Sequence, residues 1–439
     1  MNTHIEKKDF LGLAISLALS VLYCGAFWRQ ASFTSMILCC LILLFGFFAL
    51  KKEPKNILQR DEKLFALSLL LFFVSALLSF LIGHGYELKS IRNPSMPSLL
   101  DIDLSSKYLL GALIFVLFLK LKFVLQKKIV FYSIALGGVI CGIFAGYERY
   151  VLGCGRVDGL SGIAEFADES SILALLSMII FTFFANTRER PLFALSIFAS
   201  SFAMLATGTR GASLGIVLSL IAFLFLVWFY QKKFFKSSLI ASLFCVLAFV
   251  FIFIFIFNGG IKDSLRVQSA VSDIEYYDQG NIGTSLGARF EMWKEAVAMF
   301  QMAPFFGLST YEISQNLREI RERSGSQIPR DAKDRDARNE AVGNKHSQIL
   351  NAAAKRGVVG VLALLFVWFA YFKLFYRYLK AKQSHIFAFA LSALMIGFYY
   401  LFPNSFTGDV WESNVSVPLI ILSVCLFYKL ILQERECAI

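Results

Sequence analysis

Long apolar runs separated by polar segments recur along almost the whole chain, and they limit the possible folds more than any other feature. A helix needs about 20 apolar residues to cross the hydrocarbon core of a bilayer, where it must satisfy its own backbone hydrogen bonds. The runs therefore predict an all-α, polytopic membrane protein with twelve spans. These spans lie near residues 10–28, 31–50, 64–82, 108–125, 129–147, 168–186, 191–207, 211–230, 238–257, 358–376, 385–402 and 415–432.

Composition argues against an ordinary soluble domain. Hydrophobic residues make up 57% and charged residues 17% of the 439 residues, whereas soluble domains average about 45–50% and about 25%. The net charge of +12 lies between the apolar runs, not on a basic helix with interleaved aromatics, so nucleic-acid binding is not indicated. The first run ends at Trp28 and Arg29 instead of a small-residue cleavage site, so we expect a retained helix and not a signal peptide.

The positive charges predict how the chain is oriented. With a cytoplasmic amino terminus, the basic segments 51–63, 120–128, 231–236 and 373–382 all fall in the cytoplasm. The segment 403–414, which would lie outside, holds no lysine or arginine. Twelve crossings then return the carboxyl terminus to the cytoplasm.

One external segment is much longer than the others. Residues 258–345 separate the ninth span from the tenth, so we divide the single membrane domain into spans one to nine (1–257), this loop, and spans ten to twelve (346–439). Loops of this length are usually functional.

The middle of the long loop has helical spacing. In "GARFEMWKEAVAMFQMAPFFG" the residues Phe290, Trp293, Val297 and Phe300 share one face, and Pro304 then ends the helix. This pattern predicts an amphipathic helix at the outer membrane surface.

Several common kinds of active site are absent from the sequence. It contains no Walker A loop, no His-Glu-x-x-His, no Gly-x-Ser-x-Gly, no Cys-x-x-Cys and no cluster with metal-ligand spacing. The predicted spans also hold almost no ionisable groups, which argues against a transporter.

Two external arginines follow small residues at predicted helix starts. Arg210 opens the eighth span after Gly208 in "ATGTRGASLG", and Arg289 follows Gly287 in the long loop. A guanidinium binds phosphate in a bidentate way, and a helix N-terminus adds positive potential. The pattern therefore indicates a phosphate-bearing ligand, although an interfacial or snorkelling arginine is the alternative interpretation.

His346 lies where the charged loop meets the tenth span, in "GNKHSQILNAAAKRGVVG". We expect the helix to start near Asn344, a good cap, so that His346 sits in its first turn. The helix dipole and nearby arginines would favour the neutral imidazole, which can accept a proton. The alternative is a capping or interfacial histidine. Of the other histidines, only His84 is predicted to face outward.

Four further residues are auxiliary candidates. Arg156 and Asp158 lie in the external turn 147–162, and Asp409 and Glu412 lie in "TGDVWESN". Asp409 and Glu412 could orient a substrate or a partner residue, and the alternative interpretation for all four residues is an ordinary structural role in a polar loop.

The ordered motifs resemble those of the O-antigen ligase superfamily, whose members include O-antigen ligases, O-antigen polymerases and protein O-oligosaccharyltransferases. "TGTRG" precedes one span, and "HSQILNAAAKRGVVG" opens another after the long loop. Many relatives place Asn directly after the histidine and an acidic residue further on, whereas this chain has Ser347, Gln348 and Asn351. The residues that match the shared pattern are Arg289, Trp293, Pro304, Gly307, His346, Leu350, Gly357 and Gly360.

The resemblance implies a GT-C type glycosyltransferase in the bacterial inner membrane, with its active site facing the periplasm. It would transfer O-antigen from undecaprenyl diphosphate to lipid A-core oligosaccharide, with inversion and among membrane lipids. Arg210 and Arg289 would hold the diphosphate and His346 would be the base, with no metal or cofactor. A polymerase or a protein O-oligosaccharyltransferase remains the alternative, and a lipid-linked glycan transporter is less favoured.

Overall fold

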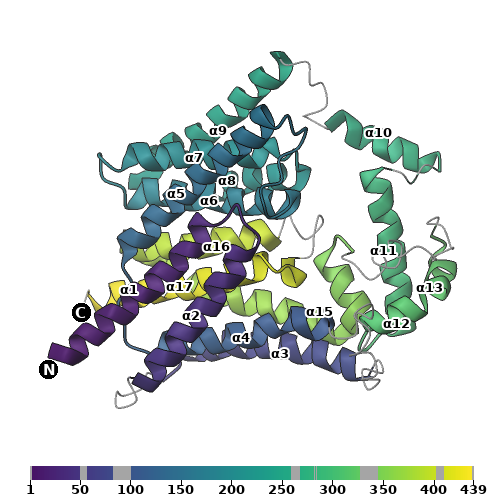
Figure 1. The fold of residues 1–439 in the computed structure, drawn as a ribbon, viewed down its shortest axis with the longest axis horizontal. Coiled ribbons are helices and arrows are strands. Elements are labelled where there is room, and N and C mark those ends of the chain that lie inside the picture. Colours follow the sequence, from purple (N-terminus) through teal and green to yellow (C-terminus); the bar gives the residue numbers. More distant parts are fainter. Residues whose placement is uncertain are drawn as a thin grey trace.

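The computed structural model describes residues 2–49, 57–82, 100–258, 267–280, 282, 284–326, 345–401 and 410–437. Every regular element in this part of the chain is helical, apart from one isolated bridge pair between Trp28 and Leu160. The helices form a bundle with an elaboration at one end (Figure 1), and the predicted all-α membrane class is confirmed.

Twelve helices of the described chain correspond to the twelve predicted runs. They are α1 (Asn2–Cys24), α2 (Gln30–Ala49), α3 (Arg60–Ile82), α4 (Leu100–Lys120), α5 (Lys127–Gly146), α6 (Ile163–Phe183), α7 (Arg190–Ala206), α8 (Arg210–Tyr230), α9 (Phe235–Asn258), α15 (Gln348–Tyr376), α16 (Ser384–Leu401) and α17 (Ser416–Glu436). Single helical turns complete them at η3 (Tyr147–Val151), η4 (Lys232–Phe234), η5 (Arg377–Lys380) and η7 (Val410–Glu412).

Length and hydropathy are sufficient for membrane crossing in nine helices of the described residues. The first and seventh predicted spans are shorter apolar helices, Asp9–Cys24 and Arg190–Ala206. The fourth ends at Lys120, five residues before the predicted boundary at 125, because residues 121–126 leave the helical conformation.

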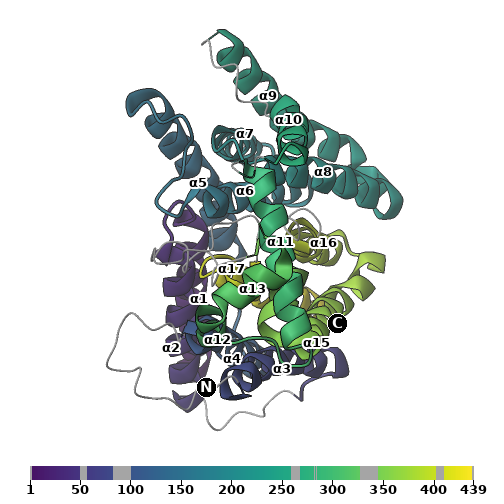
Figure 2. The same cartoon turned by 90° about the vertical axis from the view of Figure 1, so that its right-hand side faces the viewer.

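Four further helices lie beyond the end of the bundle that is opposite to the two chain termini (Figure 1). The view in Figure 2 shows them crossing in front of that end. We call this side the loop end of the bundle. The four helices are α10 (Val267–Asp278), α11 (Ser285–Met302), α12 (Thr310–Gln315) and α13 (Leu317–Ser324).

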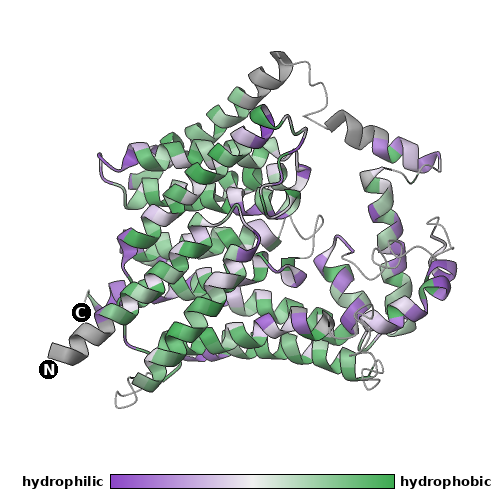
Figure 3. Ribbon diagram, viewed as in Figure 1, coloured by the Kyte–Doolittle hydropathy of each residue, from purple (hydrophilic) through white to green (hydrophobic). Residues whose placement is uncertain are grey.

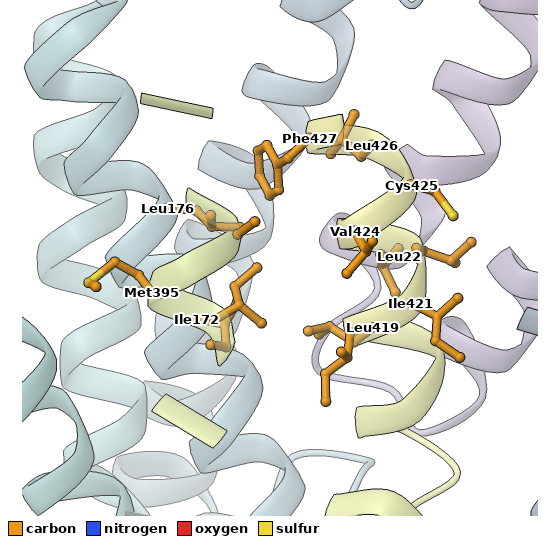
Figure 4. Packing of buried hydrophobic residues seen from close by; sticks show 14 of the residues in the cluster. Leu22, Ile172, Leu176, Met395, Leu419, Ile421, Val424, Cys425, Leu426 and Phe427 are labelled. Atoms are coloured by element: carbon orange, nitrogen blue, oxygen red, sulfur yellow. The ribbon is translucent and has the colours of Figure 1, made fainter. Parts of the chain in front are cut away.

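The centre of the bundle is formed by helices that are apolar on all sides. In the most apolar window of α6, 94% of residues are buried, and the share is 89% in α17 but only 28% in α9. A helix that is apolar all round must be surrounded by protein or lipid, so α6 and α17 form the core and α9 forms the periphery. Figure 3 shows hydrophobic residues along the bundle helices, and Figure 4 shows side chains of α1, α6, α16 and α17 packed in the core.

The loop helices are anchored to the bundle by a second, small apolar cluster. It joins α11 to α13 and α15 through Ala296, Met299, Ile320 and Ala354. Val297 of the predicted apolar face is instead 44% exposed. α11 therefore packs on protein through a face that the apolar spacing did not indicate.

A break in α15 interlocks with the end of α11. Gly357 has φ 61° and ψ −157°, and a Cβ atom there would lie 2.4 Å from the carbonyl carbon of Phe305. The Val358 N–H donates to the Pro304 carbonyl oxygen at 2.8 Å. Gly307, with φ 71°, approaches the Arg356 backbone so closely that a Cβ atom would lie 2.1 Å from its nitrogen. Both positions require glycine, which explains these motif residues physically.

Candidate active site

Arg210 is the first residue of α8 at the loop end of the bundle. It follows Thr209, which has extended backbone, and Gly208, whose φ of 64° makes the tight turn. Its Nη1 atom lies 3.3 Å from Oδ2 of Asp273 on α10. The helix start therefore presents this guanidinium to the loop helices, as its position before a span predicted.

Arg289 lies in the second turn of α11, half-buried. Thr284 caps this helix by accepting a hydrogen bond from the Gly287 N–H at 3.0 Å. Burial and the nearby charge of Arg210 both lower the pKa of the Arg289 guanidinium. No carboxylate among the described residues pairs with Arg289. The structure thus brings the two predicted arginines together, and an anion between them would relieve their repulsion.

His346 lies directly before α15 and not in its first turn. The helix begins at Gln348, and the Ser347 Oγ atom accepts from the Leu350 N–H at 3.4 Å, so Ser347 is the cap. The predicted cap, Asn344, lies outside the described residues. Among the described residues, His346 is the single non-glycine residue with positive φ, at 51°. Such strain of about 1–3 kcal/mol persists only where neighbouring contacts impose it.

Those contacts come from α11 through the buried residue Lys345. Its carbonyl oxygen accepts from Trp293 Nε1 at 3.0 Å, and its Nζ atom lies 3.3 Å from the Glu295 carboxylate. Glu295 also pairs with Arg321 of α13 at 3.2 Å. The backbone ahead of His346 is therefore fixed to α11, about 6 Å along the helix axis from Arg289.

Burial has a marked effect on Lys345. Loss of solvation lowers its pKa to about 8, although the neighbouring Glu295 charge opposes the shift. No motif in the sequence predicted a site role for Lys345, Glu295 or Arg321. The one local signal was the pair Glu291 and Glu295, four residues apart among apolar neighbours.

Arg156 joins the turn that carries Arg210. Its Nε atom donates to the Thr207 carbonyl oxygen at 2.8 Å and lies beside Gly208. The Asp158 residue is exposed. Its backbone N–H donates to the Glu148 carboxylate at 3.0 Å, which fixes the turn. Among the described residues, the Asp158 side chain makes no ion pair with Arg210 or Arg289.

Glu412 belongs to a different group of charges. Its carboxylate lies 2.7 Å from Lys355 Nζ and 3.5 Å from Arg356 Nη2, just before the break in α15. Burial raises the pKa of this carboxyl, but the two cations outweigh burial and hold it below its usual value. Glu412 therefore positions the partner residues Lys355 and Arg356, and its role towards a substrate stays a prediction. Asp409 lies outside the described residues.

No group of three or more histidine, cysteine, aspartate or glutamate side chains that could hold a metal ion occurs in the described part of the chain. What the site does assemble is two guanidinium groups, a strained histidine and the turn of Arg156.

Comparison with known proteins assigns a family to this region. Residues 194–365 match the family model described as O-antigen ligase. The chain carries an O-antigen ligase family domain. The resemblance seen in the motifs is confirmed, and the ligase-family segment runs from α7 into α15. It contains Arg210, Arg289 and His346.

Two relatives match most of the length of this chain. An uncharacterized protein of Haemophilus influenzae is 27% identical over 342 residues, which are 76% of this chain and 77% of that protein. The O-antigen ligase of Escherichia coli K12 is 26% identical over 297 residues, which are 67% of this chain and 65% of the ligase. The match thus spans slightly less than two thirds of the Escherichia coli ligase.

Proposed function

We propose that this protein transfers O-antigen from undecaprenyl diphosphate to lipid A-core oligosaccharide at the periplasmic face of the bacterial inner membrane. The observation that carries the proposal is the pair Arg210 and Arg289 at the loop end, inside the matched ligase domain. Two adjacent guanidinium groups, one without a carboxylate partner among the described residues, suit a diphosphate.

The chemistry follows from the charges. The bond between the anomeric carbon and the diphosphate oxygen breaks, and the arginines stabilise the negative charge that develops on that oxygen. The acceptor hydroxyl attacks the opposite face of the anomeric carbon, so the configuration inverts. His346 accepts the proton of that hydroxyl as the new glycosidic bond forms. The guanidinium groups supply positive charge that a divalent cation supplies in other enzymes, and we infer a metal-independent transfer by a glycosyltransferase of the GT-C type.

The bundle geometry supports the proposed orientation. Both chain termini lie at the end opposite to α10–α13 (Figure 1), as an even number of crossings requires. The basic segments predicted to be cytoplasmic are connected to the helix ends on that side, so the positive-inside rule puts the loop end in the periplasm.

A transfer assay with defined acceptors tests the proposal. Purified protein in nanodiscs receives undecaprenyl-diphosphate-linked glycan together with lipid A-core, a second lipid-linked glycan or a pilin-like protein. We expect a transfer product when lipid A-core is the acceptor and none with the other two acceptors. Transfer only to the second glycan would identify a polymerase instead, and transfer only to the pilin-like protein would identify a protein O-oligosaccharyltransferase. Movement of the intact lipid-linked glycan across the bilayer without any transfer would identify a transporter.

A further inference from the structure

A groove of about 650 Å³ lies between α10, α11 and α13, and its lining residue Phe290 directly follows Arg289 in α11. Its lining includes the rings of Tyr277, Phe290 and Trp293 and the polar side chains of Lys294, Gln301 and Arg323. We call it the loop groove. The residues of the reaction proposed above do not form its walls.

The aromatic part of the loop groove is a continuous row of half-buried rings. The centroids of Tyr277 and Phe290 are 5.0 Å apart, and those of Phe290 and Trp293 are 5.7 Å apart. The polar atoms of the row are already engaged, because the Tyr277 hydroxyl donates to Glu291 at 2.7 Å and Trp293 Nε1 donates to Lys345. Lys294 Nζ lies over the Tyr277 ring, 5.4 Å from its centroid, so the row offers the groove apolar surface directly beside a cation.

The polar part of the loop groove consists of exposed side chains. Lys294, Gln301 and Arg323 are all exposed, and Lys294 is held by Glu291 at 2.8 Å. These groups donate hydrogen bonds, and the Gln301 carbonyl can also accept them. A pyranose ring has one apolar C–H face and a rim of hydroxyl groups, so a row of rings with polar neighbours is complementary to it.

The position of the groove selects which sugar-bearing molecule it can hold. On α10, Asp273 contacts Arg210 and Tyr277 lies one turn further on. On α11, Trp293 lies one turn after Arg289, and Gln301 is about 18 Å from Arg289 along the axis. Both walls thus lead away from the arginine pair. In a lipid-linked donor the first sugar is attached directly to the diphosphate, so the donor glycan extends in this direction.

We propose that the loop groove binds pyranose units of the donor glycan while its diphosphate lies between Arg210 and Arg289. This inference rests on the proposed function. An acyl chain of a membrane lipid could cover the rings but offers no hydrogen bonds to the polar rim of the groove, which is why a saccharide fits better.

The test compares two exposed arginines of α13. Arg323 lines the loop groove and pairs with Glu319 at 2.7 Å, whereas Arg318 lies away from the groove and pairs with Glu322 at 3.0 Å. The double variant Gln301→Ala/Arg323→Ala removes two rim groups. Its matched control is Arg318→Ala, which breaks an ion pair of the same kind.

Transfer is measured with a donor that carries several sugars and with a donor that carries a single sugar. Loss of two hydrogen bonds is expected to raise KM for the long donor about tenfold in the double variant, with kcat unchanged. The KM for the single-sugar donor and all values of the Arg318→Ala control should not change. An equal change for both donors, or no change for either, would overturn the inference.

A binding measurement separates this inference from the proposed function. The probe is the free glycan released by acid hydrolysis of the long donor, and saturation-transfer NMR reports its contact with the full-length protein in nanodiscs. We expect contact with the native chain and the control, and a loss of at least tenfold in affinity in the double variant. Equal binding by all three proteins would overturn the inference even if transfer occurs. Selective binding would support it even if lipid A-core is the wrong acceptor.

Discussion

At Arg289 a partly buried positive charge lies beside a second one, and the described residues supply no carboxylate to balance it. The proposed role depends on the planar fork of the guanidinium, which lysine lacks. We expect Arg289→Lys to lower the rate of transfer about 100-fold, the loss seen when one donor to a developing oxyanion is removed. Initial rates with purified protein measure this.

The control for that variant is Arg318→Lys, because Arg318 has a side chain that is 84% exposed and should tolerate lysine. Near-normal transfer by Arg289→Lys, with the control also normal, would contradict the assignment of Arg289 to the diphosphate.

His346 permits a variant that separates catalysis from folding. Glycine adopts a φ of 51° without strain, so His346→Gly should melt at or above the temperature of the native protein. Because the variant lacks an imidazole, we expect transfer to fall by about 100-fold or more. Thermal melting and initial rates of the same preparation measure the two effects.

His385→Ala is the matched control, since His385 lies near Glu434 at the opposite end of the bundle and should not affect transfer. If His346→Gly transfers at the native rate, His346 is not the base.

At the scale of the elements, the break in α15 is the feature most sensitive to substitution. Gly357→Ala places a methyl group against the Phe305 backbone and forces a conformation that is nearly exclusive to glycine. We expect a loss of about 3 kcal/mol of stability, seen as a lower melting temperature in detergent. Gly155→Ala is the control, because the described residues leave open space there and its φ is not positive. Equal melting of the two variants would show that the interlock contributes nothing.

The junction between α11 and α13 should respond to pH through Lys345. Its pKa is lowered to about 8 in the folded protein, so between about pH 8 and its ordinary value of 10.5 the unfolded chain binds more protons. Stability contributed by this group therefore rises with pH across that window and is constant below it. The melting temperature of the native protein relative to Lys345→Met should increase from pH 8 to pH 10. A relative decrease over that range would show that the ion pair with Glu295 outweighs burial.

At the scale of the whole molecule, the predicted orientation can be checked by labelling. Single cysteines introduced at Arg318 and at Lys232, in a variant without native cysteines, should react oppositely with a membrane-impermeant maleimide. We expect labelling at position 318 in intact spheroplasts and at position 232 only after lysis, because the two sites lie on loop-end and terminal-end segments. The reverse pattern would place the candidate site in the cytoplasm.

The positions of the membrane helices could be predicted from the sequence because a 20-residue apolar run is a local signal. The positions of Arg210 and Arg289 near helix starts were also foreseeable, since both follow small residues. The start of α15 could not be predicted, because Ser347 and Asn344 are equally good caps in isolation.

Other features depend on contacts between residues far apart in the chain. The group formed by Glu295, Arg321 and Lys345 joins residues up to fifty positions apart, and no local pattern links them. The same is true of Glu412, whose partners Lys355 and Arg356 lie in another helix. One sequence reveals such charged residues, but it does not reveal which of them form ion pairs.

The contact between Arg210 and Asp273 has a consequence for how a substrate arrives. The guanidinium already has an anionic ligand from α10, so binding of a diphosphate is an exchange of one anion for another. The carboxylate that is released turns away from Arg210, while α10 keeps its contact with α11 through Tyr277 and Phe290. Loading of the site therefore requires the Arg210–Asp273 pair to break, and added salt should lower the barrier to that step by screening the resident pair.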